Sequence, residues 1–363
     1  MKVAIFHDYI RFIGGGEKTV LTLARALGAD VITTDVDRDA VAKMGFGDVR
    51  IVSLGGTVKA PPFTQLHASR KFRSCDFSRQ YDRFVMSGNW AVFACRKHRP
   101  NLWYCYTPVR AFFDRYDHMR NGLGLAGRLY GPYVSLHKRR YLDAVKDAET
   151  VIAISEVVRE RVKRYLGREA AIIYPPVDVE GFSYIEDGGF WLSVNRLYPE
   201  KRVELQVEAF RQMPGERLVI IGGYGKGDHS ERYARRIMRS LPPNVSIVSN
   251  VDDATLKDYY GRCRGLVATS ADEDFGLNAA EAMAAGKPVI AVREGGYLET
   301  VVPGVTGTLI DPDPGALARA VRGMSTGWTW SREACERRGR DFDGRMFERR
   351  MKEAIEGAGR GDA

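Results

Sequence analysis

Residues 270–290, SADEDFGLNAAEAMAAGKPVI, carry the clearest structural pattern in the chain. The apolar run at 265–269 predicts a strand before them, and helix-forming residues from about 277 to 285 predict a helix. Gly286 and Pro288 mark the end of that helix, because glycine favours the left-handed cap and proline cannot continue a helix. The apolar run at 288–292 predicts the next strand. Strand, loop, helix and strand in this order form the repeating unit of a parallel α/β sheet.

The same alternation recurs through both halves of the chain and predicts an α/β fold with two doubly wound, Rossmann-like domains facing a cleft. Further strands are predicted at 3–6, 84–86, 102–106, 150–154, 171–174, 190–194, 218–221, 245–248 and 307–310. We predict an N-terminal domain at 1–180, a second domain at 181–340 and a final helix at 341–363. Gly339 and Gly344 should interrupt the helical pattern of the tail.

Length and composition agree with this organisation. The chain has 363 residues, 44% of them hydrophobic, which is enough for two domains with cores of their own. Five scattered cysteines without a CxxC pair indicate neither a disulfide framework nor a zinc site. Residues 1–8 do not predict a signal peptide, and no apolar run is long enough to span a bilayer. We therefore expect a cytoplasmic protein, or one attached peripherally to the inner face of the membrane.

The charge is concentrated in the first half. The formal net charge is +9, and residues 1–185 contain 29 basic and 19 acidic residues. Such an excess suits an anionic partner: nucleic acid, a phospholipid surface or a phosphorylated acceptor. No recognition motif supports nucleic acid, and we expect none to bind.

Basic and aromatic residues alternate most densely at 128–141, RLYGPYVSLHKRRY. Tyrosine and leucine could enter the headgroup layer of an anionic membrane there, while Lys138, Arg139 and Arg140 meet the lipid phosphates. An ordinary solvated basic helix is the competing interpretation.

Two loops carry candidate chemistry. Glu273 lies on the loop before the predicted helix and Glu281 lies one turn inside it, and the first-turn amides of Leu277 and Asn278 suit a phosphate. The two carboxylates could then hold the hydroxyl groups of a ribose and of a sugar. The alternative is an ordinary strand-to-helix loop with two solvated glutamates.

The second loop, NRLYPEK at 195–201, directly follows the predicted strand 190–194. It places Arg196 and Lys201 beyond the carboxyl end of that strand, where two cations could neutralise a diphosphate. Taken alone, the two cations are more often a solvated surface pair.

Together these segments resemble the retaining GT-B glycosyltransferases of family four. Residues 273–290 match the pattern E-x-F-G-x-x-x-x-E-A-M-A-x-G-x-P-V-I throughout. The similarity extends to Gly295-Gly296 with Glu299, to the 195–201 loop and to the glycine turn at 14–16 before a helix. The resemblance covers nearly the whole chain, and it implies that the final helix crosses back onto the first domain.

The resemblance also implies roles for individual residues. Arg196 and Lys201 grip the donor diphosphate with the amides of Gly14, Gly15, Leu277 and Asn278. Glu281 holds the ribose, and Glu273 contacts the transferred sugar. The catalytic residues implied are Glu273, Arg196 and Lys201, and the donor-binding stretch includes Phe275 and Gly276. The family works without metal or another cofactor, so the D-x-D patterns at 35–37, 272–274 and 311–313 are interpreted as chance matches.

Finer similarities point to a mannosyltransferase-like branch. The segments 104–114, 173–178 and 221–228 favour GDP-mannose as donor, although Tyr106 stands where that branch usually has histidine. Tyr106 and His7 are candidates for the acceptor or sugar side of the site; a packing tyrosine and a core imidazole are the alternatives.

The resulting expectation is transfer of a hexose from a nucleotide sugar to a lipid-linked or polysaccharide acceptor, with retention and without an enzymic nucleophile. A UDP-sugar-dependent glucosyl- or N-acetylglucosaminyltransferase and a nucleotide-sugar-binding protein without turnover are the alternatives.

Overall fold

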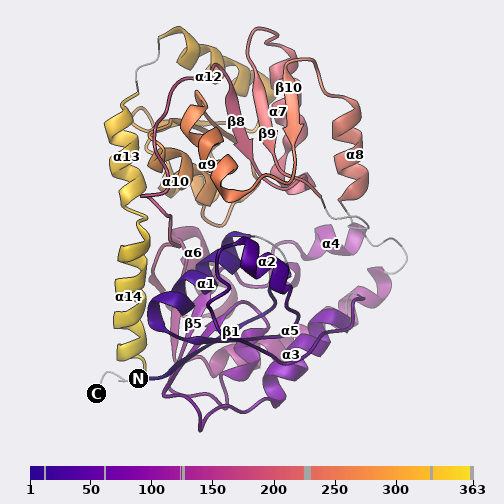
Figure 1. The fold of residues 1–363 in the computed structure, drawn as a ribbon. Coiled ribbons are helices and arrows are strands. Elements are labelled where there is room, and N and C mark those ends of the chain that lie inside the picture. Colours follow the sequence, from indigo (N-terminus) through magenta and orange to yellow (C-terminus); the bar gives the residue numbers. More distant parts are fainter. Residues whose placement is uncertain are drawn as a thin grey trace. The chain divides into compact units, whose positions relative to one another are not determined.

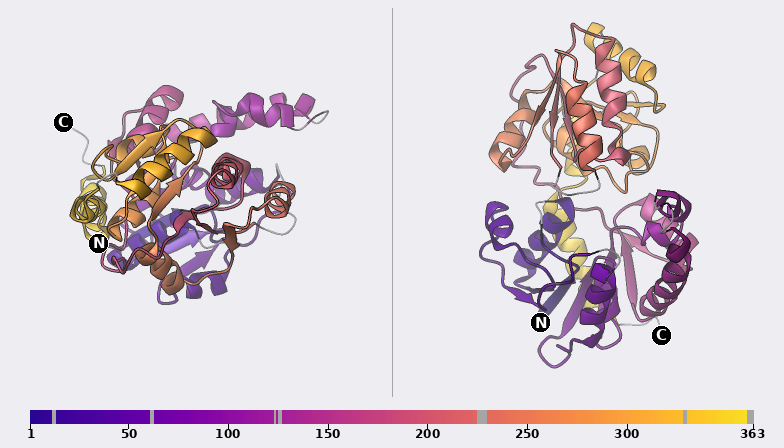
Figure 2. Two further views of the ribbon diagram at one scale, coloured as in Figure 1. Left: turned by 90° about the horizontal axis from the view of Figure 1, so that it is seen from above. Right: turned by 90° about the vertical axis from the view of Figure 1, so that its right-hand side faces the viewer.

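The computed structural model describes residues 1–11, 14–60, 63–122, 124, 127–224, 230–327 and 330–359. The chain divides into two compact units. Unit 1 contains Met1–Tyr174 and the C-terminal residues from Phe347 onward, and unit 2 contains Pro175–Met346. Each unit has a parallel sheet flanked by helices (Figures 1 and 2). The predicted doubly wound α/β fold is confirmed.

The sheet of unit 1 has the strand order β3-β2-β1-β4-β5-β6-β7, and every pairing in it is parallel. Its strands are β1 (Val3–His7), β2 (Asp30–Thr33), β3 (Ile51–Ser53), β4 (Arg83–Ser87), β5 (Asn101–Cys105), β6 (Thr150–Ala153) and β7 (Ala171–Ile172). The central strands β1, β4 and β5 consist of almost completely buried residues, as expected for strands covered on both faces.

The helices of unit 1 follow the strands in the chain. They are α1 (Gly15–Leu27), α2 (Arg38–Lys43), α3 (Phe63–Ser74), η1 (Ala91–Ala94), η2 (Arg110–Phe112), α4 (Tyr116–Gly122), α5 (Gly127–Lys146) and α6 (Glu156–Leu166). The C-terminal helix α14 (Gly344–Gly357) also packs here. Its Phe347, Met351 and Ile355 are buried, and the Phe347 ring meets Tyr104 edge to face with centroids 5.7 Å apart.

The sheet of unit 2 has the strand order β10-β9-β8-β11-β12-β13, again all parallel. Its strands are β8 (Trp191–Val194), β9 (Leu218–Ile221), β10 (Val245–Val248), β11 (Gly265–Ala268), β12 (Val289–Val292) and β13 (Gly307–Ile310). The helices are η4 (Pro199–Lys201), α7 (Val203–Arg211), α8 (Glu231–Arg239), α9 (Asp253–Arg262), α10 (Leu277–Ala284), α11 (Tyr297–Thr300), α12 (Pro314–Thr326) and α13 (Arg332–Arg340). As predicted, the helical tail is interrupted: α13 ends at Arg340 and α14 begins at Gly344.

The strand order fixes where chemistry belongs in each unit. In unit 2 the chain starts at β8, moves outward to β9 and β10, and then returns to the other side of β8 at β11. Connections on the two sides of this switch point diverge, so ligands of such sheets bind at the carboxyl ends of these two strands. The loops after β8 and β11 are the ones on which the sequence places its candidate residues.

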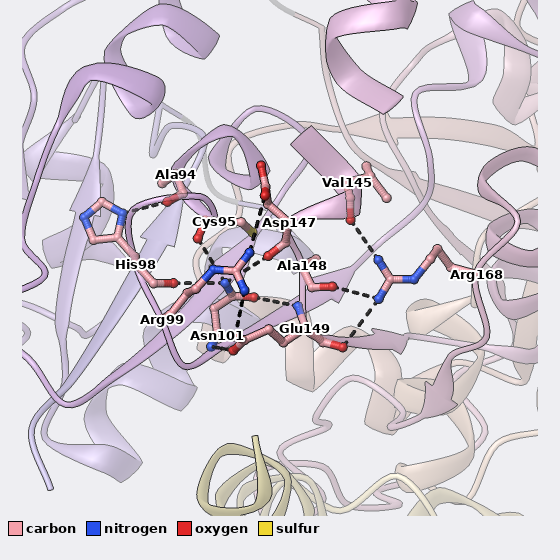
Figure 3. A network of polar contacts seen from close by, with 10 residues as sticks. All are labelled: Ala94, Cys95, His98, Arg99, Asn101, Val145, Asp147, Ala148, Glu149 and Arg168. Carbon is pink, nitrogen blue, oxygen red and sulfur yellow. Dashed lines mark hydrogen bonds and ion pairs between the residues drawn. The ribbon is translucent and has the colours of Figure 1, made fainter. Parts of the chain in front are cut away.

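In unit 1, a polar network connects the segments at the amino ends of the sheet strands (Figure 3). The Asn101 amide donates hydrogen bonds to the carbonyl oxygens of Cys95, His98 and Asp147, at 3.1, 2.9 and 3.2 Å. Arg99 forms ion pairs with Asp147 and Glu149. Because this network surrounds the amino ends of β5 and β6, it stabilises the fold and lies away from the functional edge of that sheet.

Candidate active site

Two loops of unit 2 are bonded to each other at the carboxyl edge of the sheet. The Ala271 amide donates to the Glu200 carbonyl oxygen at 2.8 Å, and the Thr269 hydroxyl donates to the Lys201 carbonyl oxygen at 2.8 Å. The loop after β8 and the loop after β11 therefore form one structure.

This structure brings two of the predicted catalytic side chains together. Lys201 Nζ lies 2.7 Å from Glu273 Oε2, and the side chains of the two residues are 25% and 23% exposed. Both charges remain open to a ligand. A diphosphate bound here would compete with Glu273 for the ammonium group, and the carboxylate would turn to hydroxyl donors.

The N-terminus of α10 opens onto the same edge. Gly276 is its N-cap residue and has a left-handed φ of +88°, and a Cβ at this position would lie 2.7 Å from the ring of Tyr297. Glycine at the N-cap provides no side-chain cap, and the Asn278 Oδ1 accepts from the Ala279 amide, at 2.9 Å. The first-turn amides of Leu277 and Asn278 thus lie where a helix has no intrahelical acceptors and where its dipole favours an anion. The side-chain amide of Asn278 donates to the Val194 carbonyl oxygen at 3.1 Å, which connects this helix terminus to the end of β8.

The Gly295-Gly296 turn packs against the main chain of the Glu273 loop. The Gly296 amide donates to the Glu273 carbonyl oxygen at 2.7 Å. A Cβ on Gly296 would lie 2.4 Å from Phe275 Cα, so only glycine permits this contact. The sequence match included this pair but gave it no role; the structure makes it a support for Glu273.

The other predicted donor residues lie in the same unit with different surroundings. Arg196 lies two residues after the end of β8, is exposed, and has its guanidinium carbon 6.0 Å from the centroid of the Tyr198 ring. Glu281 lies on α10 and accepts a hydrogen bond from Tyr260 at 2.7 Å. Phe275 is buried with its ring edge to face against Phe342, so any donor contact it makes comes from its main chain.

A further cation on this edge was not predicted. Arg202 has a left-handed φ of 49° and donates to both carboxylate oxygens of Glu294, at 3.0 and 2.9 Å. Glu294 Oε2 in turn accepts from the Asp272 amide at 3.3 Å. This pair joins the loops after β8, β11 and β12. The sequence gives one indication of the Arg202–Glu294 pair, which is the position of Arg202 directly after Lys201.

In unit 1 the predicted residues gather around the glycine turn. Gly14 is the N-cap residue of α1 and Gly15 is its first residue. The Tyr106 hydroxyl donates to the Gly16 carbonyl oxygen at 3.1 Å and accepts from the Ser87 hydroxyl at 3.2 Å. The side chain of Tyr106 therefore supports the backbone of the glycine turn.

His7 belongs to the same group. Its Nδ1 lies 3.0 Å from the Ser87 carbonyl oxygen, which requires the proton on Nδ1. Burial lowers its pKa to about 4, and burial likewise raises the pKa of Tyr106. Both side chains are consequently neutral at pH 7. His7 is a buried, hydrogen-bonded imidazole, as the alternative interpretation held.

Asp8 is a half-buried carboxylate directly after β1 that sequence reasoning did not select. It accepts hydrogen bonds from the amides of Asn89, Trp90 and Ala91 at 2.9, 2.8 and 2.7 Å. Burial raises its pKa to about 6 despite these bonds. Asp8 fixes the turn that follows Ser87, and the residues that show this are eighty positions away in the chain.

Two family models cover almost the whole chain. Residues 13–180 match the model described as Glycosyltransferase Family 4, and residues 183–342 match the model described as Glycosyl transferases group 1. The chain belongs to glycosyltransferase family four.

Relatives of this family-four protein include several mannosyltransferases. An alpha-1,3/1,6-mannosyltransferase of Dictyostelium discoideum is 23% identical, and the match covers 86% of each chain. A D-inositol 3-phosphate glycosyltransferase of Catenulispora acidiphila is 36% identical over 38% of this chain and 35% of its own. The match to an uncharacterised glycosyltransferase of Methanocaldococcus jannaschii is 26% identical over 46% and 47%. The chain thus spans less than half of two of these relatives.

Solved structures agree on the fold. The Anabaena protein HepE in complex with UDP and glucose superimposes with a TM-score of 0.76 at 20% identity, over 98% of this chain and 99% of that one. The sucrose-phosphate synthase of Thermosynechococcus elongatus gives a TM-score of 0.76, also at 20% identity, over 98% of each chain. This family-four chain therefore has the GT-B fold that the sequence pattern implied.

Three aspartates of the D-x-D patterns at 35–37 and 311–313 have structural roles in this glycosyltransferase. Asp37 and Asp313 cap the N-termini of α2 and α12, and Asp35 forms an ion pair with Arg11 at 2.6 Å. Among the described residues no group of three metal-ligating side chains converges. Residues 225–228, the second half of the 221–228 similarity, lie outside the described residues.

Proposed function

We propose that the protein transfers a hexose from a nucleotide-diphosphate sugar to a hydroxyl of a lipid-linked or glycan acceptor, with retention at the anomeric carbon. The observation that carries the proposal is the Lys201–Glu273 pair beside the N-terminus of α10, where the N-cap Gly276 provides no side-chain cap. A cation, a carboxylate and two helix-terminal amides meet there at the switch point of a family-four sheet. They suit a diphosphate that leaves and a sugar whose hydroxyls must be held.

The proposed chemistry assigns a task to each group. Lys201, Arg196 and the first-turn amides of α10 stabilise the charge that grows on the departing diphosphate. Glu273 holds the sugar hydroxyls as the anomeric carbon becomes cationic. A diphosphate oxygen takes the acceptor proton on the same face, so no nucleophile from the protein and no metal ion is required.

GDP-mannose is the proposed donor, and mannose is the sugar that is transferred. Support comes from the relatives: besides the Dictyostelium mannosyltransferase, a mouse protein named as a GDP-Man-dependent alpha-1,2-mannosyltransferase is 30% identical over 41% of this chain. A UDP-sugar is the competing donor. The name of the mouse protein, which contains the acceptor Man(3)GlcNAc(2)-PP-Dol, also favours a lipid-linked acceptor over a free sugar.

We also propose that the protein works at the inner face of a membrane. No helix in the described part of the chain is long and apolar enough to cross a bilayer. Helix α5 instead exposes Leu129 and Leu136, 77% and 54% accessible, among the exposed cations Arg128, Arg139 and Arg140. Two leucines seven residues apart share one helix face, which is the pattern of interfacial insertion beside anionic lipid.

A donor panel tests the function. Thermal unfolding is measured with GDP-mannose, UDP-glucose and UDP-N-acetylglucosamine, since a ligand at 100 times its Kd adds about 2.7 kcal/mol of stability. Release of the nucleoside diphosphate from the stabilising donor then shows turnover. A stabilising donor that is never consumed would favour the alternative of a binding protein.

The Lys201→Ala variant connects the function to the site. We expect transfer under donor-limiting conditions to fall about 100-fold, because one charge-assisted contact to the leaving group is lost in a preorganised site. Lys257→Ala is the matched control: Lys257 is also 25% exposed, but it pairs with Asp178 at 2.8 Å and with Asp253 at 2.9 Å. Equal rates in both variants would contradict the assignment.

A further inference from the structure

A buried tyrosine holds the second carboxylate of the donor site. Tyr260, in the last turn of α9, donates its hydroxyl to Glu281 Oε2 at 2.7 Å. Tyr260 is fully buried, and its ring lies edge to face against the ring of Phe182 with centroids 5.3 Å apart. The hydroxyl of Tyr260 therefore serves the carboxylate on the neighbouring helix α10.

We propose that Tyr260 is a positioning residue that fixes the carboxylate of Glu281 for recognition of the ribose diol of the nucleotide. This role rests on the proposed function, because it presupposes that a nucleoside diphosphate binds at α10.

The backbone around Tyr260 is anchored independently of α10. The Gly261 carbonyl oxygen accepts from the amides of Ile185 and Glu186 at 2.9 and 3.2 Å, and the Arg262 carbonyl oxygen accepts from Gly188 at 2.7 Å. A Cβ on Gly261 would lie 2.7 Å from the Ser183 carbonyl oxygen. The segment 183–188 thus packs directly on the last turn of α9, which fixes the position of the Tyr260 hydroxyl.

A fixed donor is useful because a glutamate carboxylate rotates readily about its last torsion. A hydrogen bond to Oε2 removes that freedom. Burial and the neighbouring Glu281 raise the pKa of Tyr260, so the phenol stays protonated and acts as a donor. An ionised carboxylate has about four lone-pair positions, so it can accept from this phenol and from ribose hydroxyls together.

Binding of GDP, UDP and their 2′,3′-dideoxy counterparts, measured by calorimetry, tests the role. For Tyr260→Phe we expect the ribonucleotide that the wild type binds to lose affinity about five- to tenfold, since a hydrogen bond to a charged group is weakened rather than removed. Affinity for its dideoxy counterpart should stay within about twofold of wild type, because that ligand has no diol to recognise.

Tyr259→Phe is the control on the same helix. Its ring packs on Phe190 with centroids 5.9 Å apart, and it should leave both affinities unchanged. Glu281→Asp provides a second variant in case Tyr260→Phe unfolds: it withdraws the carboxylate from the phenol while keeping the charge, and should reproduce the selective loss. In a Glu281→Gln background, Tyr260→Phe should have no further effect on the preference for the ribonucleotide.

Unchanged ribonucleotide affinity in folded Tyr260→Phe would overturn the role, and so would equal losses for the ribo and dideoxy ligands. A wild type that binds neither GDP nor UDP would overturn the proposed function itself. That result differs from failure of the positioning role, which leaves wild-type binding intact.

Discussion

Tyr106 joins two segments that are ninety positions apart in the chain. It follows β5, and its hydroxyl reaches back to the Gly16 carbonyl oxygen in the first turn of α1. Ser87, at the end of β4, completes the connection. A residue chosen from the sequence for its unusual identity thus proves to hold the backbone of the glycine turn, and its effect on a ligand would be transmitted through that turn.

Removing the Tyr106 hydroxyl should therefore affect donor binding. For Tyr106→Phe we expect the KM for the nucleotide sugar to rise about five- to tenfold with little change in kcat, because the loss of one hydrogen bond, worth about 1 kcal/mol, loosens the glycine turn. Steady-state kinetics over a range of donor concentrations measure the two parameters separately.

Tyr104→Phe is the comparison for this experiment. Tyr104 is buried on β5, two residues before Tyr106, and donates to the Ile173 carbonyl oxygen at 3.0 Å, away from the glycine turn. It should lower the melting temperature and leave the KM unchanged. A similar KM in both variants would show that the bond to Gly16 is irrelevant to donor binding.

Among the elements, α5 exposes leucines beside arginines on its solvent-facing side, a pattern typical of a binding surface. Its buried side includes Val134, His137 and Tyr141, which pack in unit 1, while its other side exposes leucine among cations. Such a helix binds favourably at an anionic membrane surface, where the leucines enter the apolar layer and the cations meet the lipid headgroups.

The double variant Leu129→Ser and Leu136→Ser tests that surface. We expect its partition onto vesicles containing phosphatidylglycerol to fall at least tenfold in co-sedimentation, since each leucine removed from water contributes about 1.5–3 kcal/mol. High salt should weaken the binding of both proteins by screening the cations. Leu298→Ser, in unit 2 and of similar exposure at 52%, should bind like wild type; loss of binding there would contradict a specific role for α5.

The elements also show which parts of the fold the sequence could predict. The long apolar runs of β4, β5, β8, β9 and β11 were predicted within a residue or two, but β2 and β3 were not. β2 begins with the acid Asp30, which is buried because the Tyr81 hydroxyl donates to it at 2.5 Å, and β3 has three residues. No local pattern reports a partner fifty-one residues away.

The same limit applies to the site. Glu273, Lys201 and the start of α10 followed from a contiguous motif and from strand-end placement. The partners that hold them did not, because Tyr260 contacts Glu281 only through the packing of α9 on α10. Asp8 was missed for the same reason: its three amide donors lie beyond another strand.

On the scale of the whole molecule, unit 1 contains three buried histidines that burial keeps neutral. The pKa values of His7 and His137 are lowered to about 4, and that of His98 is also lowered. In the unfolded chain these groups take up protons near pH 6.5. Acidification from pH 6.5 toward 4 therefore favours the unfolded state. Asp8 opposes this below pH 6, because its raised pKa lets the folded state take up a proton first.

We accordingly expect the melting temperature of unit 1 to fall between pH 7 and pH 5. By pH 5, protonation in the unfolded chain costs the folded state about 2 kcal/mol for each of His7 and His137, against a single opposing carboxyl group. The His7→Asn variant keeps a donor for the Ser87 carbonyl oxygen and loses the titration, so its pH dependence should be shallower. A wild-type melting temperature that rises on acidification would contradict this balance.

Unit 1 is assembled from both ends of the chain, since Met1–Tyr174 is completed by α14 after 172 intervening residues of unit 2. The ribosome therefore releases everything needed for unit 2 before it releases the last piece of unit 1. During synthesis the surface that Phe347, Met351 and Ile355 later cover stays open. Cleavage of the chain or a premature stop just before Phe347 would destabilise unit 1, far from the break in sequence, while unit 2, complete at Met346, could still fold.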